Sequence, residues 1–154
     1  MPIKKSKIHS SVKIIDKNLV NIYGCEIGKN TKVGPFVEIQ SDVVIGKNCK
    51  ISSHSFICSG VEIEDNVFIG HNVTFINDRH PKSVNSKGKL KGSNDWTLEK
   101  TIIREGVSIG SGSVIMCGIE IGKNSIIGAA TLVLKNVPRN KTYYNKIKNN
   151  IRWI

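Results

Sequence analysis

Aromatic residues are scarce in this chain of 154 residues, in which phenylalanine, tyrosine and tryptophan together make up 6%. Its four cysteines form no Cys-x-x-Cys pair, which argues against disulfide bonds and for a reducing compartment. The segment 1–7 is basic, but no long apolar run follows it, so neither a signal peptide nor a membrane span is indicated. We therefore expect a cytoplasmic protein with no membrane partner.

Carboxylates are few relative to cations, and the formal net charge is +11. A charge of this sign suits nucleic-acid binding, but the cations are not clustered as they are in a binding arm. Lys29, Lys47 and Lys123, for example, each occupy the centre of a repeated Gly-Lys-Asn tripeptide, where a solvated corner is the simpler explanation. We expect no nucleic-acid partner, since anionic small ligands explain the charge equally well.

What the sequence does contain is a strict period of six residues. A first series of large apolar residues recurs at this spacing. A second series of small or β-branched residues, from Cys25 to Val73, lies two positions before the members of the first. A helix needs apolar spacings of three and four, whereas a six-residue period is typical of a parallel β-helix. The first series comprises Ile27, Val33, Ile39, Ile45, Ile51, Ile57, Ile63, Ile69 and Phe75, and it resumes at Ile103, Ile109, Ile115, Ile121, Ile127 and Val133.

Three hexapeptides make one triangular coil of eighteen residues, and the Gly-Lys-Asn tripeptide recurs one coil apart at 28–30 and 46–48. We expect an all-β parallel β-helix over residues 1–137, of about five to six coils. A looser first coil acts as a cap, in which Ile8, Ile14 and Val20 keep the step before one extra residue near Gly24 shifts it. Residues 138–154 form a basic tail with Tyr143, Tyr144 and Trp153 as apolar anchors.

The period breaks after Ile76, and a polar segment without any repeat occupies residues 77–100. A loop of this length in a compact fold is usually functional or disordered. Its middle, residues 83–93, is rich in Ser, Lys, Gly and Asn and is expected to be mobile. Its ends carry specific chemistry, Asn-Asp-Arg-His-Pro and Asp-Trp. Subtracting one coil places Asn77 and Asp78 over Ser59 and Gly60.

Two histidines fall at one corner of adjacent coils, because the same subtraction places His71 over Ser53, next to His54. Imidazole is the side chain best suited to move a proton near neutral pH. This corner and the Asn77 corner are held apart within one triangular prism. A site that uses both would therefore span two subunits.

Three stretches together indicate a family. Residues 51–61, residues 75–82, and Asp95-Trp96 with residues 109–112 resemble bacterial nucleotide-sugar N-acetyltransferases. The closest group acetylates the 3-amino group of dTDP-3-amino-3,6-dideoxyhexoses, with UDP-linked relatives, for lipopolysaccharide or O-antigen synthesis. The resemblance, which covers residues 8–137, implies a left-handed β-helix, acetyl-CoA as co-substrate, no metal, and a homotrimer with sites between neighbouring prisms.

The resemblance also assigns residues by position. Asn77 matches an asparagine near the sugar amine and His54 a histidine lining that pocket, so both are predicted to be catalytic. Backbone matching Ser111 and Ala129 contacts the pantetheine arm, and Lys135 matches a lysine that meets the coenzyme's phosphates. The predicted substrate-binding residues are Asp78, Arg79, His71 and Trp96. The chain departs from the family at Ser59, where many relatives carry glutamate, and at 145–154, which lacks a Gly-Asn-Pro-Ala sequence.

Two other classes remain open on the sequence. A hydroxyl acceptor on a sugar or serine needs a base during attack, so an O-acetyltransferase would require one of the two histidines. A non-catalytic scaffold, or a zinc-binding β-helix module, would require histidines converging at a subunit interface. His80 lies at the start of the loop and the chain has no His-x-x-x-x-His spacing, so we expect no metal.

Overall fold

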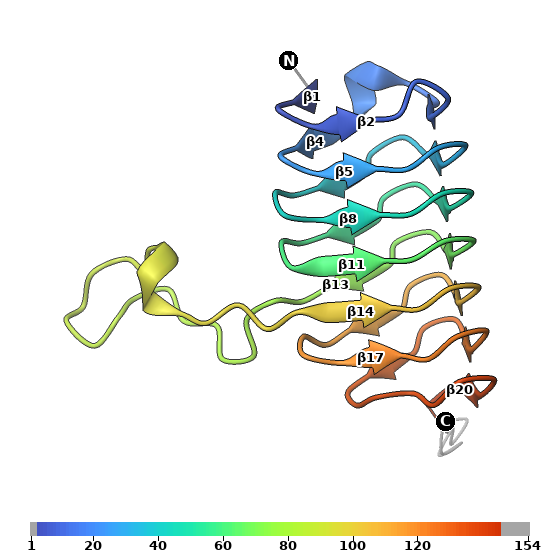
Figure 1. Cartoon of the computed structure of the whole chain (residues 1–154). Helices are drawn as coiled ribbons and strands as arrows, with labels where there is room; N and C mark the ends of the chain where they lie inside the picture. Colours follow the sequence, from blue (N-terminus) through green and yellow to red (C-terminus); the bar gives the residue numbers. More distant parts are fainter. Residues whose placement is uncertain (1–2, 146–154) are drawn as a thin grey trace, which may run out of the picture.

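The computed structural model describes residues 3–145, except for the side chain of Ser93, and shows a prism built from three parallel sheets (Figure 1). Sheet A contains β1 (Ile3–Lys4), β4 (Asn21–Tyr23), β7 (Glu38–Ile39), β10 (Phe56–Ile57), β13 (Thr74–Phe75), β16 (Val114–Ile115) and β19 (Leu132–Val133). Sheet B contains β2 (Lys7–Ile8), β5 (Glu26–Ile27), β8 (Val44–Ile45), β11 (Val61–Ile63), β14 (Thr101–Ile103) and β17 (Glu120–Ile121). Sheet C contains β3 (Lys13–Ile14), β6 (Lys32–Val33), β9 (Lys50–Ile51), β12 (Phe68–Ile69), β15 (Ser108–Ile109), β18 (Ile126–Ile127) and β20 (Thr142–Tyr143).

The two sequence series form the core. The aliphatic residue at the end of each strand points inward, and the small residue two positions earlier turns the chain into the strand with its own side chain buried. Ile39, Ile69 and Ile109 are fully buried, as are Val43 and Val73 of the second series. In Figure 1 the chain runs left to right along the near face and returns behind it while descending, so the coils wind left-handed. The predicted fold class is confirmed.

The first coil departs from the predicted phase. In the regular coils the register is one coil apart, as in Ile45 paired with Ile63, but β3 pairs Lys13 with Lys32. The 3₁₀ helix η1 (Lys17–Leu19) lengthens the first coil, so Ile22 takes the inward strand position and pairs with Ile39. Val20, predicted to hold that position, instead belongs to the small-residue series.

The corners between sheets are named here by the sheets they join: corner BC, corner CA and corner AB. Corner CA comprises residues 34–36, 52–54, 70–72, 110–112 and 128–130. Its third residue adopts positive φ in every one of these coils, at Phe36, His54, Asn72, Gly112 and Ala130. Non-glycine residues rarely adopt this conformation, and here the rigid coils above and below impose it.

The long loop leaves corner AB after β13 and returns at β14, so the register jumps to Ile63 paired with Ile103. Figure 1 shows it extending sideways, away from the prism. Its middle, for which mobility remains a prediction, forms a short hairpin. Val84 and Leu90 form an antiparallel bridge, closed by Asn85, whose Oδ1 accepts hydrogen bonds from the Lys87 and Lys89 backbone N–H groups. The 3₁₀ helix η2 (Ser93–Asp95) follows.

At the C-terminal end, sheet C continues past the predicted boundary at residue 137. Strand β20 pairs with β18, and Tyr143 packs against the core while Tyr144 is exposed. With seven strands in sheets A and C, the prism is taller than the predicted five to six coils. The third proposed anchor, Trp153, lies outside the described residues.

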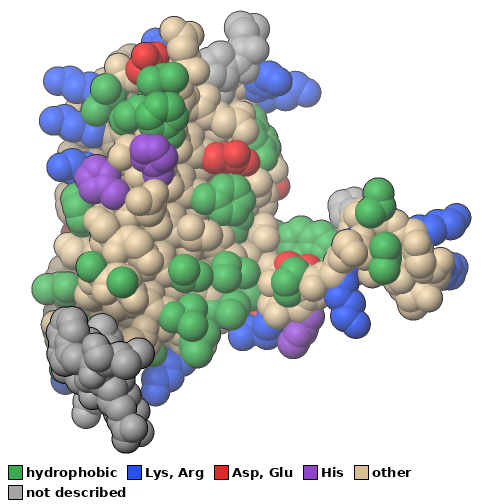
Figure 2. All heavy atoms as spheres, turned by 180° about the vertical axis from the view of Figure 1, so that it is seen from behind, with side chains coloured by type: hydrophobic (Ala, Val, Ile, Leu, Met, Phe, Trp, Pro, Cys, Tyr) green, Lys and Arg blue, Asp and Glu red, His purple; other side chains and the backbone are tan. Residues whose placement is uncertain are grey.

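Each sheet presents a different kind of outer face. The outward residues of sheet A include Phe56, Val114 and Leu132, and those of sheet B include Glu26, Glu62 and Glu120. The outward residues of sheet C are Lys13, Lys32, Lys50, Phe68, Ser108, Ile126 and Thr142, none of which is acidic. Figure 2, which views the prism from behind, shows hydrophobic side chains gathered between the histidines and the loop.

Candidate active site

Asn77 lies at the point where the rigid coil gives way to the loop. Its Nδ2 group donates a hydrogen bond to the Ser59 carbonyl, one coil away, at 3.4 Å. A backbone carbonyl can only accept, so this contact fixes which way the Asn77 amide faces. Within residues 3–145, Oδ1 of Asn77 accepts no hydrogen bond from the protein. The predicted placement of Asn77 over Ser59 is confirmed.

The predicted substrate-binding residues of the loop come together. Asp78, Arg79 and Trp96 line one cavity of about 240 Å³ at the base of the loop, although they are up to eighteen positions apart in the sequence. The remaining lining residues are His80, Lys91, Asp95, Thr97 and Glu99. Asp78 is held there by two contacts, because its Oδ1 accepts from the His80 N–H at 2.9 Å and its Oδ2 lies 3.5 Å from Lys91 Nζ.

Arg79 faces protein groups at the loop base. Its Nε and Nη2 donate to the two carboxylate oxygens of Glu99, at 3.1 and 2.8 Å, and Nη2 also donates to the Cys117 carbonyl at 2.8 Å. The paired guanidinium lowers the pKa of Glu99 below its ordinary value, and the same hydrogen bond raises the pKa of Arg79. Bidentate pairs of this kind combine charge with fixed geometry.

The second group of predicted residues lies along corner CA. Nδ1 of His71 is 2.8 Å from the Ser53 hydroxyl, and the His71 N–H donates to the Ser111 hydroxyl at 3.0 Å. His54 stacks on Phe36 with ring centroids 4.7 Å apart. The two histidines therefore lie on adjacent coils as predicted, but only His71 has its ring oriented by a hydrogen-bonding side chain.

Below the histidines, corner CA becomes a strip of small residues. A Cβ added at Gly110 would collide with the Ala129 backbone, so the two coils approach closely there. The Ala130 N–H donates to the Ser111 carbonyl, whereas the N–H groups of Ser111 and Ala129 donate to no acceptor within residues 3–145. Both residues are exposed, so these N–H groups lie at a corner of the prism that side chains leave uncovered.

The structure separates the predicted coenzyme residues. Ser111 and Ala129 share corner CA, but Lys135 lies exposed on corner AB, below the loop, between β19 and the bridge residue Val137. Within one chain, the loop cavity and the corner CA strip lie at opposite edges of sheet A. A single chain therefore holds two half-sites.

Sequence reasoning missed two residues of the loop half-site. Lys91 keeps only 16% of its side chain exposed, which is unusual for lysine, and Glu99 joins the returning end of the loop to its start. Lys91 lies in the segment 83–93, which the sequence predicts to be mobile, and Glu99 lies three residues after the Asp95-Trp96 pair. The only signal in the sequence is the polar character of the loop as a whole, which does not distinguish these two residues from their neighbours.

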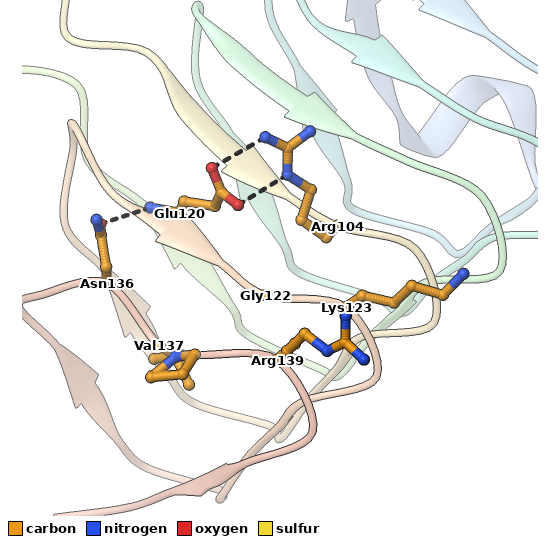
Figure 3. Close-up of a pocket in the computed structure, with 8 residues that line it drawn as sticks. Arg104, Glu120, Gly122, Lys123, Asn136, Val137 and Arg139 are labelled. Carbon is orange, nitrogen blue, oxygen red and sulfur yellow. Dashed lines mark hydrogen bonds and ion pairs between the residues drawn. The ribbon is translucent and has the colours of Figure 1, made fainter.

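A larger hollow of about 480 Å³ lies on the last coils of sheet B, and none of the predicted site residues lines it (Figure 3). Arg104 there binds both oxygens of Glu120 at 2.9 Å, and its Nη1 binds Glu64 at 2.8 Å. Lys123 is paired with Glu105 at 2.6 Å. Because acidic partners balance these cations, the hollow offers little net charge to an anion.

Among residues 3–145, no group of three or more His, Cys, Asp and Glu side chains is placed to hold a metal ion. The described part of the chain also contains no helix that is both long and apolar enough to cross a bilayer.

The sequence of this chain is similar to a family model and to several known proteins. Residues 24–59 and 100–135 match the bacterial transferase hexapeptide model (six repeats). The galactoside O-acetyltransferase of Lactococcus lactis is 39% identical over 71 residues, covering 46% of this chain and 32% of that protein. The bifunctional protein GlmU of Ruthia magnifica is 31% identical over 149 residues, covering 95% of this chain and 32% of that protein. The chain thus spans about a third of the length of these relatives.

Among solved structures, a variant of AntD, an N-acyltransferase from Bacillus cereus, superposes with a TM-score of 0.65 at 21% identity. The match covers 97% of this chain and 82% of AntD, whose structure contains dTDP-4-amino-4,6-dideoxyglucose and coenzyme A. At this identity the likeness establishes the fold. Residues 24–59 and 100–135 therefore match the bacterial transferase hexapeptide model in sequence, and they form coils of the β-helix in the structure.

Proposed function

We propose that this protein transfers an acetyl group from acetyl-CoA to the 3-amino group of a nucleotide-linked 3-amino-3,6-dideoxyhexose, dTDP-linked rather than UDP-linked. It does so in the cytoplasm, for the synthesis of a cell-surface glycan, and without a metal. The hexapeptide repeats and the acyltransferases that share them support acyl transfer from coenzyme A. The sequence of the loop entry supports the amino-sugar acceptor.

The observation that carries the proposal is the orientation of Asn77. With Nδ2 held by the Ser59 carbonyl, Oδ1 is left as a hydrogen-bond acceptor at the mouth of the loop. An amide oxygen accepts from a neutral amine without favouring its protonation. A carboxylate in the same place would favour the ammonium ion, which has no lone pair for attack. Asn77 therefore suits an amine nucleophile.

The chemistry needs no strong base. A neutral amine attacks the thioester carbon directly to form a tetrahedral intermediate. Loss of the amine proton and cleavage of the C–S bond then give the amide and release coenzyme A, whose thiolate takes up a proton. Holding amine and thioester together supplies proximity, and the free N–H groups of Ser111 and Ala129 are suited to the pantetheine amide or to the developing oxyanion. Proton loss can go to solvent or to a histidine on corner CA.

The two half-sites meet if copies of the chain assemble. Sheet A separates the loop from corner CA and carries the apolar residues Phe56, Val114 and Leu132 on its outer face. Packing this face against a second copy would bring the loop of one chain to corner CA of its neighbour. Closed rings satisfy such head-to-tail contacts, and a homotrimer is the ring we propose.

Incubation of the purified protein with acetyl-CoA and a panel of amino sugars tests the proposal. The panel contains dTDP- and UDP-linked 3-amino and 4-amino 6-deoxyhexoses, with thiol release and product mass as readouts. We expect the fastest release with a dTDP-3-amino sugar. A preference for a 4-amino sugar would show that the acceptor is the 4-amino group instead of the 3-amino group. If no amino sugar causes thiol release, N-acetylation is refuted.

An O-acetyltransferase is the second candidate, favoured by the hydrogen bond between His71 and Ser53. That contact orients the ring of an exposed histidine through Nδ1, which leaves Nε2 as the nitrogen to act as general base for a hydroxyl. Galactosides and serine belong in the same assay, because relatives carry those acceptors in their names. Release with a hydroxyl acceptor alone would establish this alternative.

A further inference from the structure

The two ends of the long loop are tied together at its base. Arg79 belongs to the outgoing end and Glu99 to the returning end, and their bidentate pair closes the loop twenty residues apart. The same guanidinium reaches the carbonyl of Cys117 on the next coil. One side chain therefore joins both ends of the loop to the prism.

Two glycines on the neighbouring coils make room for the returning end. A Cβ at Gly60 would meet the Leu98 side chain at 3.0 Å, and one at Gly118 would collide with the Glu99 carboxylate. Both glycines have positive φ, +86° and +71°. Leu98 and Glu99 are thus seated against the coil above and the coil below the point where the loop leaves.

Resting on the function proposed above, we infer that Arg79 and Glu99 form a positioning lock that fixes the acceptor half of the active site. Asn77 lies two residues before Arg79, with a single 3.4 Å side-chain contact to Ser59. Asp78 lies between them and anchors Lys91. Without the lock, the outgoing end is held only by these weaker contacts, and Oδ1 of Asn77 loses its fixed direction.

This role differs from the one predicted from the sequence, in which Arg79 binds the substrate. Nε and Nη2 are already committed to Glu99 and Cys117, so the face that makes a bidentate contact is occupied by the protein. Only Nη1 is left, so a substrate phosphate could form a two-nitrogen fork with Arg79 only by displacing Glu99 or the Cys117 carbonyl. Arg79 is therefore a positioning residue.

The chain supplies a matched control. Arg104 and Glu120 form the same bidentate contact, at 2.9 Å for both hydrogen bonds, and their side chains are about as exposed as those of Arg79 and Glu99. That pair lies on sheet B (Figure 3), and neither residue lines the loop cavity or belongs to corner CA. Removing the Glu99 or the Glu120 side chain should therefore lower the free energy of global unfolding by similar, small amounts.

The first experiment measures loop opening without any substrate. Glu99→Ala and Glu120→Ala keep every lysine and arginine, so trypsin has the same sites in both variants, among them Lys82, Lys87 and Lys89 in the loop. We expect loop cleavage to accelerate about tenfold in Glu99→Ala and to stay within about twofold of the parent in Glu120→Ala. Equal cleavage rates in the two variants would refute the lock, whatever the protein's activity.

The second experiment is a double-mutant cycle on turnover, with Arg79→Ala, Glu99→Ala and the double variant. A lock predicts equal losses of kcat, about tenfold, that do not add in the double variant, with the KM for acetyl-CoA unchanged within about twofold. Glu99→Gln keeps one acceptor oxygen and should recover part of the loss. If Arg79→Ala loses far more than Glu99→Ala, Arg79 contacts the substrate and the inference is wrong.

Discussion

The Asn77 side chain hydrogen-bonds across one coil to the carbonyl of Ser59, with 3.4 Å between donor and acceptor. Asn77→Asp is the sharpest substitution, because it keeps the shape but cannot donate to the Ser59 carbonyl and favours an ammonium ion. We expect kcat for an amino sugar to fall about a hundredfold, with the melting temperature nearly unchanged. Asn77→Ala should lose as much; turnover within about a factor of two of the parent would make Asn77 a structural residue.

The two histidines should behave differently on substitution. Only His71 is oriented by a side chain, through Ser53, whereas His54 is stacked on Phe36. For an amine acceptor we expect His71→Ala and His54→Ala each to lower kcat less than about tenfold. A loss of about a thousandfold or more at His71 alone would instead establish a general base, and hence a hydroxyl acceptor.

Three stacked lysines on the outer face of sheet C, Lys13, Lys32 and Lys50, should lower the free energy of unfolding. Lys32 pairs directly with Lys13 on one side and Lys50 on the other, and none of the three forms an ion pair within the described residues. Like charges directly opposite on neighbouring strands repel each other. Lys32→Glu should raise the free energy of unfolding by about 0.5 kcal/mol, and Lys32→Gln by about half of that. Chemical denaturation at low salt measures the change, which should shrink at high salt.

The cysteines should be inert in the folded protein. All four are free and buried, and burial raises the pKa of Cys58 to about 12. We expect no reaction with a thiol reagent at about pH 8 until the chain unfolds, after which all four react. Rapid labelling of one cysteine in the folded protein would contradict this expectation, because it would show that the coil around that cysteine unfolds locally.

The same shift gives a pH dependence of stability. In the unfolded chain the Cys58 thiol ionises near its ordinary value of 9.0, whereas in the folded protein it stays protonated to about 12. Its contribution to stability is therefore complete below pH 9 and is lost progressively as the pH rises toward 12. Cys58→Ala should weaken the decline between these limits. An unchanged slope, measured by denaturation at fixed protein concentration, would contradict the assignment.

The loop half-site shows where prediction from sequence ended. Asp78, Arg79 and Trp96 were identified from the loop's ends, and the structure places them around one cavity. The partnership of Arg79 with Glu99 was not foreseeable, because no period relates the two residues. Their contact depends on where the returning end of an irregular loop lies.

The sequence by itself determined the β-helix, since a six-residue period leaves only one way to bury every aliphatic residue, and it determined the stacking of Asn77 on Ser59. These relations are local or follow from one coil length. The tertiary structure alone decided the rest: Ile22 in the core, the pairing of Lys13 with Lys32, and the lock on the loop. Each depends on an insertion that breaks the period, after which side-chain packing, rather than counting, sets which residues meet.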